Sequence, residues 1–313
     1  IVVKTVTDKE CAARYVRLEV VNDDVIRVSA TAGKHFSQRK SLMANYTYPA
    51  EKTWTVGESE NGYVMLETQS LRALVADDGT VTFTDLDGHP LLSEKERVLT
   101  PMTDPQADKQ GKHKSAYTLR QLWQSGDDEA YYGLGQHQSD EMNYKDKNEK
   151  LFQYNTKVTV PMIVSTKGYG ILWDNYSESR WGDARDYARL DEGFTLYDKE
   201  GKAGGLTGTY THPGAETLVR TEPFLALDNE QNNKRYAPQF PMNGATVVYE
   251  GEIEAKESGL YKFLLYYAGY TKVFVGDDEV VAERWRTAWN PNSYKFDYTL
   301  EAGHRVPLRV EWR

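Results

Sequence analysis

The stretches YYGLGQHQSD, at Tyr131 to Asp140, and VPMIVSTKGYGILWDNYSESRWGD, at Val160 to Asp183, decide the fold of this chain. In the first, Gly133-Leu134-Gly135 predicts a tight bend that ends a strand, because glycine adopts backbone angles that other residues avoid. In the second, Lys167 to Gly170 predicts a hairpin turn between two apolar strands. No helix is expected after the first bend, so its glycines do not form a phosphate-binding loop.

Short runs that alternate between apolar and polar residues recur on both sides of these stretches. Each run is typical of a strand, and the Asn, Asp and Gly clusters between runs suit tight hairpin turns. No run has the spacing and caps of a helix, and the polar segment from Lys95 to Lys114 is expected to be a loop. The predicted fold class is therefore all-β, made of antiparallel strands. The expected strands are Tyr15 to Val21, Val25 to Ala30, Gly62 to Thr68, Leu71 to Ala76, Val81 to Asp85, Met162 to Ser165, Ile171 to Asn175, Leu206 to Tyr210, Ala245 to Ile253, Gly259 to Tyr267, Lys272 to Val275, Ser293 to Leu300 and Val306 to Trp312.

Composition excludes several classes of protein. The net charge is -9, from 38 Lys and Arg against 47 Asp and Glu, and no long basic run is present, so a nucleic-acid partner is not expected. No apolar run is long enough to span a bilayer. The single cysteine, Cys11, excludes an internal disulfide, and six scattered histidines give no zinc spacing. Neither a metal nor another cofactor is expected.

The glycine-rich segment from Gly201 to Gly205 predicts a domain boundary near Ala203, because it offers backbone freedom without demanding packing. The expected domains are residues 1–203 and 204–313. The chain begins at Ile1 without a leader, and its last strand stops at Arg313 without a following turn. We therefore expect the second domain to be truncated at its C-terminal end.

The two opening stretches, together with DDVIRVSA at Asp23 to Ala30 and DDGTVTFTDLDGHPLL at Asp77 to Leu92, resemble glycoside hydrolase family 31 in their order and spacing. The resemblance implies the mutarotase-like antiparallel β-sandwich that precedes the catalytic barrel in that family. Retaining glycosidases use two carboxylates about 5 Å apart, and in family 31 both are aspartates on the barrel. Such a barrel needs roughly 250 residues of alternating strands and helices, which Ile1 to Arg313 do not offer. No catalytic residue is expected in this chain, which alone should be inactive.

The same resemblance places the long polar and aromatic loop from Glu141 to Thr159 beside the active site of the barrel. Relatives often read Trp-Asn-x-Asp there, whereas this chain reads Tyr154, Asn155, Thr156 and Lys157, so a cation replaces the carboxylate of many glucosidases. This departure speaks against ordinary α-glucosidase specificity, since a cationic donor is not equivalent to an accepting carboxylate. A histidine in a satisfied turn is the competing interpretation of His137. The candidate residues for the substrate rim are His137, Gln138, Phe152, Tyr154, Asn155 and Lys157.

The second series of strands resembles an inserted PA14 domain, through GGLTGTYTHP at Gly204 to Pro213, SGLYKFLLYYAGYTKVFVGDDEVVAERW at Ser258 to Trp285 and YTLEAGHRVPLRVEW at Tyr298 to Trp312. PA14 domains that bind sugars through calcium usually carry an Asp pair where this chain has Tyr267, Ala268 and Gly269. Calcium needs several oxygen ligands, so the resemblance does not imply a calcium site. Asp277-Asp278 is interpreted as a hairpin turn.

A polar loop with two tryptophans, from Glu283 to Asn292, is the remaining place where the second domain can contact a sugar. Trp285 matches a position that packs inside PA14 domains, so we expect it in the core and Trp289 at the surface. The candidate sugar-contact residues are Trp289, Arg286, Trp285 and Asn290.

A mutarotase-like sandwich before a PA14 insertion resembles bacterial α-xylosidases that act on xyloglucan oligosaccharides. The expected function is an accessory region that shapes the active-site rim and lengthens the substrate cleft, with an oligosaccharide or polysaccharide and the missing barrel as partners. Two alternatives stay open, an α-glucosidase of the same family and a non-catalytic carbohydrate-binding or adhesion protein. An active mutarotase is disfavoured because the six histidines show no pairing with a carboxylate by sequence. A bacterial periplasm or cell surface is the expected location.

Overall fold

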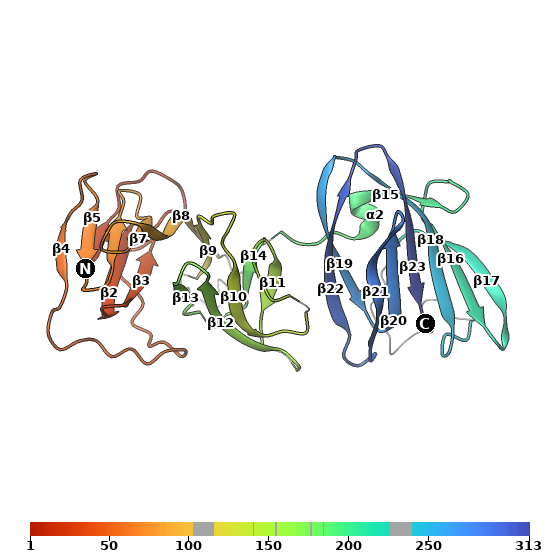
Figure 1. The fold of residues 1–313 in the computed structure, drawn as a ribbon, viewed down its shortest axis with the longest axis horizontal. Coiled ribbons are helices and arrows are strands. Elements are labelled where there is room, and N and C mark those ends of the chain that lie inside the picture. Colours follow the sequence, from red (N-terminus) through yellow and green to blue (C-terminus); the bar gives the residue numbers. More distant parts are fainter. Residues whose placement is uncertain (103–115, 140, 154, 176, 184, 226–239) are drawn as a thin grey trace, which may run out of the picture. The chain divides into compact units, whose positions relative to one another are not determined.

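A computed structural model describes residues 1–102, 116–139, 141–153, 155–175, 177–183, 185–225 and 240–313 (Figure 1). The fold is nearly all β, as predicted, and the one helix in these ranges is α2, Leu190–Gly193, of four residues. No helix in the described part of the chain is long and apolar enough to cross a membrane. The chain divides into two compact units.

The first unit comprises Ile1–Gly135, Asn143–Gln153 and Val158–Gly182. A three-stranded sheet (β1-β2-β3) and a six-stranded sheet (β4 to β9 in sequence order) are accompanied by a three-stranded sheet (β10-β12-β13) and the β11-β14 pair. Consecutive strands of the first two sheets pair antiparallel, as do β12 and β13, in keeping with the turn residues between them. The strand β11 pairs antiparallel with β14, which lies further along the chain. The bounds are β1 Val2–Lys4, β2 Tyr15–Asn22, β3 Val25–Thr31, β4 Thr55–Glu58, β5 Val64–Glu67, β6 Arg72–Val75, β7 Val81–Thr84, β8 Pro90–Pro101, β9 Tyr117–Trp123, β10 Tyr131–Gln136, β11 Asn148–Leu151, β12 Val158–Ser165, β13 Gly170–Leu172 and β14 Ser179–Gly182.

Alternating buried and less buried side chains along the strands form the two hydrophobic cores of the first unit. In β2 every second residue is buried, and Val16 and Leu18 pack with Leu66 and Val75 of the six-stranded sheet. A second cluster forms around Tyr131, Tyr144 and Ile163, with Trp181 packed against it. Tyr144 therefore lies in the core.

Two glycines in β10 allow its backbone to lie against β12. Gly133 and Gly135 have φ angles of +127° and +93°. A Cβ at Gly135 would collide with the carbonyl oxygen of Val158 and lie 2.7 Å from the nitrogen of Val160, and one at Gly133 would collide with the carbonyl oxygen of Met162. The predicted bend is thus also a close backbone approach that only glycine permits.

A buried carboxylate fastens the hairpin between β12 and β13. Glu129 accepts hydrogen bonds from the hydroxyls of Ser165 and Tyr169, the latter at 2.5 Å, and from the backbone N–H of Gly126 at 3.3 Å. Burial raises the pKa of Glu129, but these hydrogen bonds outweigh it and hold the pKa below its usual value. The ionised form is thus the one that the fold stabilises.

The second unit comprises Gln136–Met142, Tyr154–Lys157 and Asp183–Arg313. A seven-stranded antiparallel sheet has the order β17-β16-β18-β23-β20-β21, with β15 also paired to β18, and β19 pairs with β22 in a separate ribbon (Figure 1). Phe194, Phe263 and Phe296 stack in the core of this unit, with successive ring centroids 5.6 and 5.0 Å apart. The bounds are β15 Phe194–Asp198, β16 Leu206–His212, β17 Ala215–Glu222, β18 Thr246–Ala255, β19 Gly259–Tyr267, β20 Gly269–Val275, β21 Asp278–Arg286, β22 Asn292–Leu300 and β23 Arg305–Trp312.

Three expectations differ from the structure. The boundary near Ala203 falls inside the second unit, because β15 precedes it and pairs with β18. The expected loop from Lys95 is strand β8 as far as Pro101, in which Lys95 and Thr100 are exposed, Leu99 is buried and Arg97 forms a buried ion pair with Glu94. Residues 103–115 lie outside the described residues. The expected loop from Glu283 begins as strand β21, which extends to Arg286 and pairs with β20.

We expect Gly135→Ala to destabilise the first unit far more than Gly168→Ala. Both glycines have positive φ, +93° and +84°, but a Cβ at Gly168 meets nothing within 4 Å. Gly168→Ala should therefore cost about 1–2 kcal/mol of unfolding free energy from backbone strain, and Gly135→Ala more than about 3 kcal/mol because β10 and β12 must separate. Urea unfolding followed by tryptophan fluorescence measures both, and equal losses would show that the close approach is not required.

The carboxylate of Glu129 makes the stability of the first unit dependent on pH. Its folded pKa is below the usual value of 4.5, so its contribution is complete above that pH and is lost as the pH falls through the folded pKa. Glu129→Gln should lower the unfolding free energy at neutral pH by about 1–3 kcal/mol, and the difference from the wild type should shrink below pH 4.5. Glu178→Gln, at an exposed ion pair with Lys150, is the control and should change little at either pH. A difference for Glu129→Gln that stays constant from neutral pH to pH 3 would contradict this assignment.

Candidate functional site

Two short segments from earlier in the chain belong to the second unit. They are Gln136–Met142 and Tyr154–Lys157, which contain the rim candidates His137, Gln138, Asn155 and Lys157. Phe152 belongs to the first unit, where the ammonium group of Lys150 lies 4.9 Å from its ring centroid. Tyr154 lies outside the described residues. Four of the six rim candidates thus belong to the same unit as the sugar-contact candidates.

Hydrogen bonds fix these segments to the start of β22. The side-chain amide of Asn292 donates to the backbone carbonyl of Gln138, and Asn292 is itself buried opposite Tyr267 of β19. The hydroxyl of Thr156 donates to Oδ1 of Asn290 over 3.4 Å. The segments that carry Gln138 and Thr156 are therefore each bonded to the short stretch 290–292, and we call these two contacts the network around β22.

An ion pair adds a second attachment for the segment 136–142. Nζ of Lys295 lies 3.5 Å from Oε2 of Glu141, and both side chains are largely buried. A partly buried pair is harder to break than a surface one, because separation would leave a charge without compensation. Together with Asn292, this pair gives the segment a defined position on β22.

The aromatic residues of this region are at the surface. Trp289 is 65% exposed, as expected for a residue of the loop between β21 and β22. The expectation that Trp285 packs in the core is wrong, because Trp285 is 50% exposed. It lies opposite Tyr270 in β20, whose neighbour Thr271 faces the core instead. Arg286, the last residue of β21, is half-buried.

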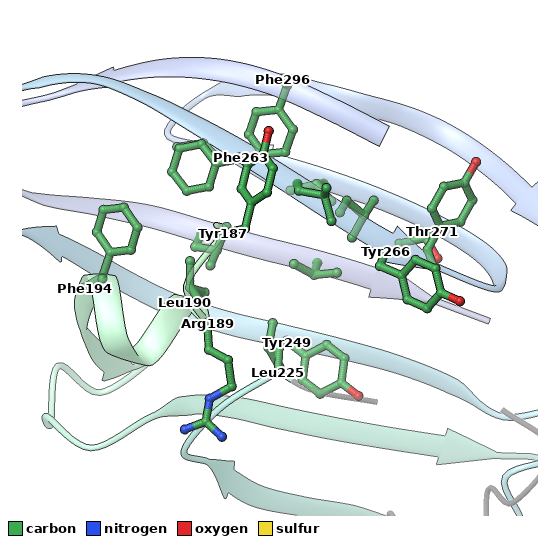
Figure 2. A pocket seen from close by; sticks show the side chains of 18 of the residues that line it. Tyr187, Arg189, Leu190, Phe194, Leu225, Tyr249, Phe263, Tyr266, Thr271 and Phe296 are labelled. Atoms are coloured by element: carbon green, nitrogen blue, oxygen red, sulfur yellow. The ribbon is translucent and has the colours of Figure 1, made fainter. Parts of the chain in front are cut away.

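A cavity of about 560 Å³ lies inside the second unit between β19 and the seven-stranded sheet (Figure 2). Its wall is mainly apolar and aromatic, including Phe194, Phe263 and Phe296, with the buried hydroxyls of Tyr249 and Thr271 among few polar groups. Burial is the main reason that the pKa of Tyr249 is raised. A sugar would lose the hydration of many hydroxyls in such a cavity, so the cavity is poorly suited to holding one.

Within the described ranges, one group of residues has the spacing for a metal ion. Ligand atoms of Asp85, Asp87 and His89 lie within 4.8 Å of one another in the turn between β7 and β8. The carboxylate of Asp85 already accepts the backbone N–H groups of Asp87 and His89, and its Oδ2 lies 2.9 Å from Nδ1 of His89. These contacts are those of an exposed Asx turn, and they explain the cluster without an ion.

The network around β22 offers hydrogen-bonding groups next to an exposed aromatic ring. The amide of Asn290, the hydroxyl of Thr156 and the backbone of Gln138 offer the donors and acceptors that sugar hydroxyls require. The exposed indole of Trp289 offers a flat apolar face for the C–H surface of a pyranose ring. The site is therefore suited to holding a neutral sugar.

Comparisons with known proteins agree with this interpretation of the fold. The model of the glycosyl hydrolase 31 N-terminal galactose mutarotase-like domain matches residues 15–181. This range is more than half of the chain, and the chain therefore belongs to glycoside hydrolase family 31.

Among curated proteins, an α-xylosidase of Saccharolobus solfataricus is 32% identical over 171 residues, covering 52% of this chain and 22% of that protein. An uncharacterized family 31 glucosidase of Pseudescherichia vulneris is 27% identical over 175 residues, covering 51% of this chain and 32% of that protein. A crystal structure of an α-xylosidase of family 31 from Xanthomonas citri matches with a TM-score of 0.84 and 37% identity, over 99% of this chain and 33% of that chain. The chain thus spans a third or less of the length of each relative.

We expect Asn292→Ala to loosen the segment 136–142. The variant loses the hydrogen bond to the carbonyl of Gln138, so local opening should become about tenfold more frequent. Limited proteolysis by subtilisin, with cleavage sites mapped by mass spectrometry, measures the cutting rate in this segment. Asn290→Ala, which removes only the longer contact to Thr156, is the control and should leave that rate near the wild-type value. Equal cutting of wild type and Asn292→Ala would contradict the assignment.

Proposed function

We propose that this chain is the accessory N-terminal region of a retaining α-glycoside hydrolase that acts as an α-xylosidase on xyloglucan oligosaccharides. Family membership supports the hydrolase class, and two of the similar proteins are named α-xylosidases. The observation that carries the role at the substrate is the grouping of Gln138 and Lys157 with Asn290 in one unit.

In this proposal the second unit is a PA14-like insertion that lengthens the substrate cleft. Trp289 stacks on a sugar ring, while Asn290 and the neighbouring Thr156 hydroxyl bind sugar hydroxyls. Lys157 donates to a hydroxyl where many glucosidases have a carboxylate that accepts, and this reversal of polarity favours a substrate other than the usual glucoside. The rim thereby selects the substrate, and the bond is cleaved elsewhere in the polypeptide.

The catalytic aspartates belong, in this proposal, to a barrel in the longer protein. The described residues contain strands and a single helix of four residues. The alternating strands and helices of a barrel must therefore come from further sequence. The accessory units then act by positioning the substrate, which converts binding energy into correct orientation at the reacting bond.

The test compares this chain with a longer version that continues through the following coding sequence. Release of p-nitrophenol is measured from p-nitrophenyl α-xyloside and p-nitrophenyl α-glucoside. We expect no hydrolysis by the 313-residue chain and faster hydrolysis of the xyloside than of the glucoside by the longer protein. Faster glucoside hydrolysis would favour the α-glucosidase alternative, and an inert longer protein that still binds glycans would favour a carbohydrate-binding or adhesion protein.

A further inference from the structure

The cavity of the second unit is larger than the voids of a packed core. Its volume is about 560 Å³, whereas voids larger than a water molecule are few in protein interiors. Pockets of roughly 300–1,000 Å³ with mainly apolar walls are typical of sites that hold small molecules. All the residues that line this cavity belong to the second unit, so this unit alone forms it.

The cavity opens to solvent along one edge of β19. Within the described ranges β19 pairs only with β22, so its other edge is not covered by a strand. Residues from both faces of β19 line the cavity, the exposed Leu264 and Tyr266 as well as Phe263 of the core. A small molecule can therefore enter without separating paired strands.

The charged residues that line the cavity are on its solvent side. Asp186 and Arg189 are exposed, and Lys262 is half-buried. The guanidinium of Arg189 is already paired with Asp191 at 2.8 Å. Among the described residues no other charged side chain lines the cavity, so an ionised ligand would lose its hydration inside without gaining a partner. The interior therefore suits a neutral ligand.

A buried hydroxyl shows where a polar group of the ligand would bind. Thr271 of β20 is 3% exposed, and in the described part of the chain its hydroxyl has no hydrogen-bond partner. The buried residues Thr271, Val273 and Val275 alternate along β20 and line the cavity, so the side chain of Thr271 faces it. Burial of a hydroxyl without a hydrogen bond is unfavourable, and a polar group on the ligand would remove this cost.

The other end of the cavity is aromatic. Figure 2 shows Phe194, Phe263 and Phe296 toward one end and Thr271 toward the other. The ring plane of Phe263 is inclined by 10° to that of Phe194 and by 6° to that of Phe296. An aromatic ligand gains ring contacts with such a cluster beyond the burial of its apolar area. The cavity thus matches a molecule with aromatic rings at one end and a hydroxyl group at the other.

We propose that the cavity binds a neutral aromatic alcohol of two or three rings. Its rings pack against Phe194, Phe263 and Phe296, and its hydroxyl group is hydrogen-bonded to the hydroxyl of Thr271. This site uses neither Gln138 nor the other groups of the network around β22, and it does not hold the sugar. It therefore does not rest on the proposed function.

Competition for a fluorescent dye tests the site in the 313-residue chain. The dye is N-phenyl-1-naphthylamine, which is neutral and emits more strongly in apolar surroundings. The competitors are 2-naphthol and 2-methylnaphthalene, which has a methyl group in place of the hydroxyl. We expect the wild type to bind the dye and both competitors. Thr271→Val should weaken the binding of 2-naphthol about tenfold, because its hydroxyl loses a partner, and should not weaken that of 2-methylnaphthalene.

Two further variants serve as controls. Thr271→Ser keeps the hydroxyl and should bind 2-naphthol like the wild type. Thr299→Val makes the same substitution at an exposed residue of β22 and should alter the binding of neither competitor. Circular dichroism shows whether each variant is folded, and Thr271→Ala takes the place of Thr271→Val if the latter is not.

A wild type that binds neither the dye nor the competitors would overturn the proposal. The same holds if loss of the Thr271 hydroxyl weakens both competitors equally or weakens neither, because that hydroxyl then makes no contact with the ligand. The assay involves no hydrolysis, so its outcome is independent of whether the longer protein cleaves the xyloside.

Discussion

The close approach of the β10 backbone to β12 is the constraint on which the arrangement of this chain depends. Gly133 and Gly135 lie so near the carbonyl groups of Met162 and Val158 that no side chain fits between the strands. Positive φ at both glycines turns the backbone as β10 ends at Gln136. The segment Gln136–Met142, which begins at the last residue of β10, belongs to the second unit. The polar residues of the YYGLGQHQSD stretch from Gln136 onward therefore lie in the second unit, directly after these two glycines.

Polar contacts then hold the segment 136–142 in a defined position on β22. The amide of Asn292 holds the carbonyl of Gln138, and the Glu141–Lys295 pair holds the same segment a few residues later. Both anchors are on β22, a strand whose own position is set by nine paired residues with β19. Side chains on a rigid strand can thus present loop residues to a ligand with little loss of conformational freedom on binding.

Sequence reasoning succeeded where local patterns carry the information. Period-two alternation identified most strands, and the Lys167 to Gly170 turn lies where β12 and β13 meet. It failed for Trp285, because a tryptophan in a strand gives no sign of which face will be covered. The contact between Gln138 and Asn292 joins residues 154 positions apart, and neither residue type signals the other. The strand β15 was missed because its pairing with β18 depends on residues some 57 positions away along the chain.

Hydrogen–deuterium exchange of the chain, with and without a saturating xyloglucan heptasaccharide, tests most directly whether the network around β22 faces the sugar. We predict slower exchange in 136–142, 155–157 and 287–292 together, since the first two segments are bonded to the third or to Asn292 at its end. Exchange in the first-unit sheet β1-β2-β3 should stay the same. Protection limited to the strands that line the internal cavity, or no protection in any of the three segments, would contradict it.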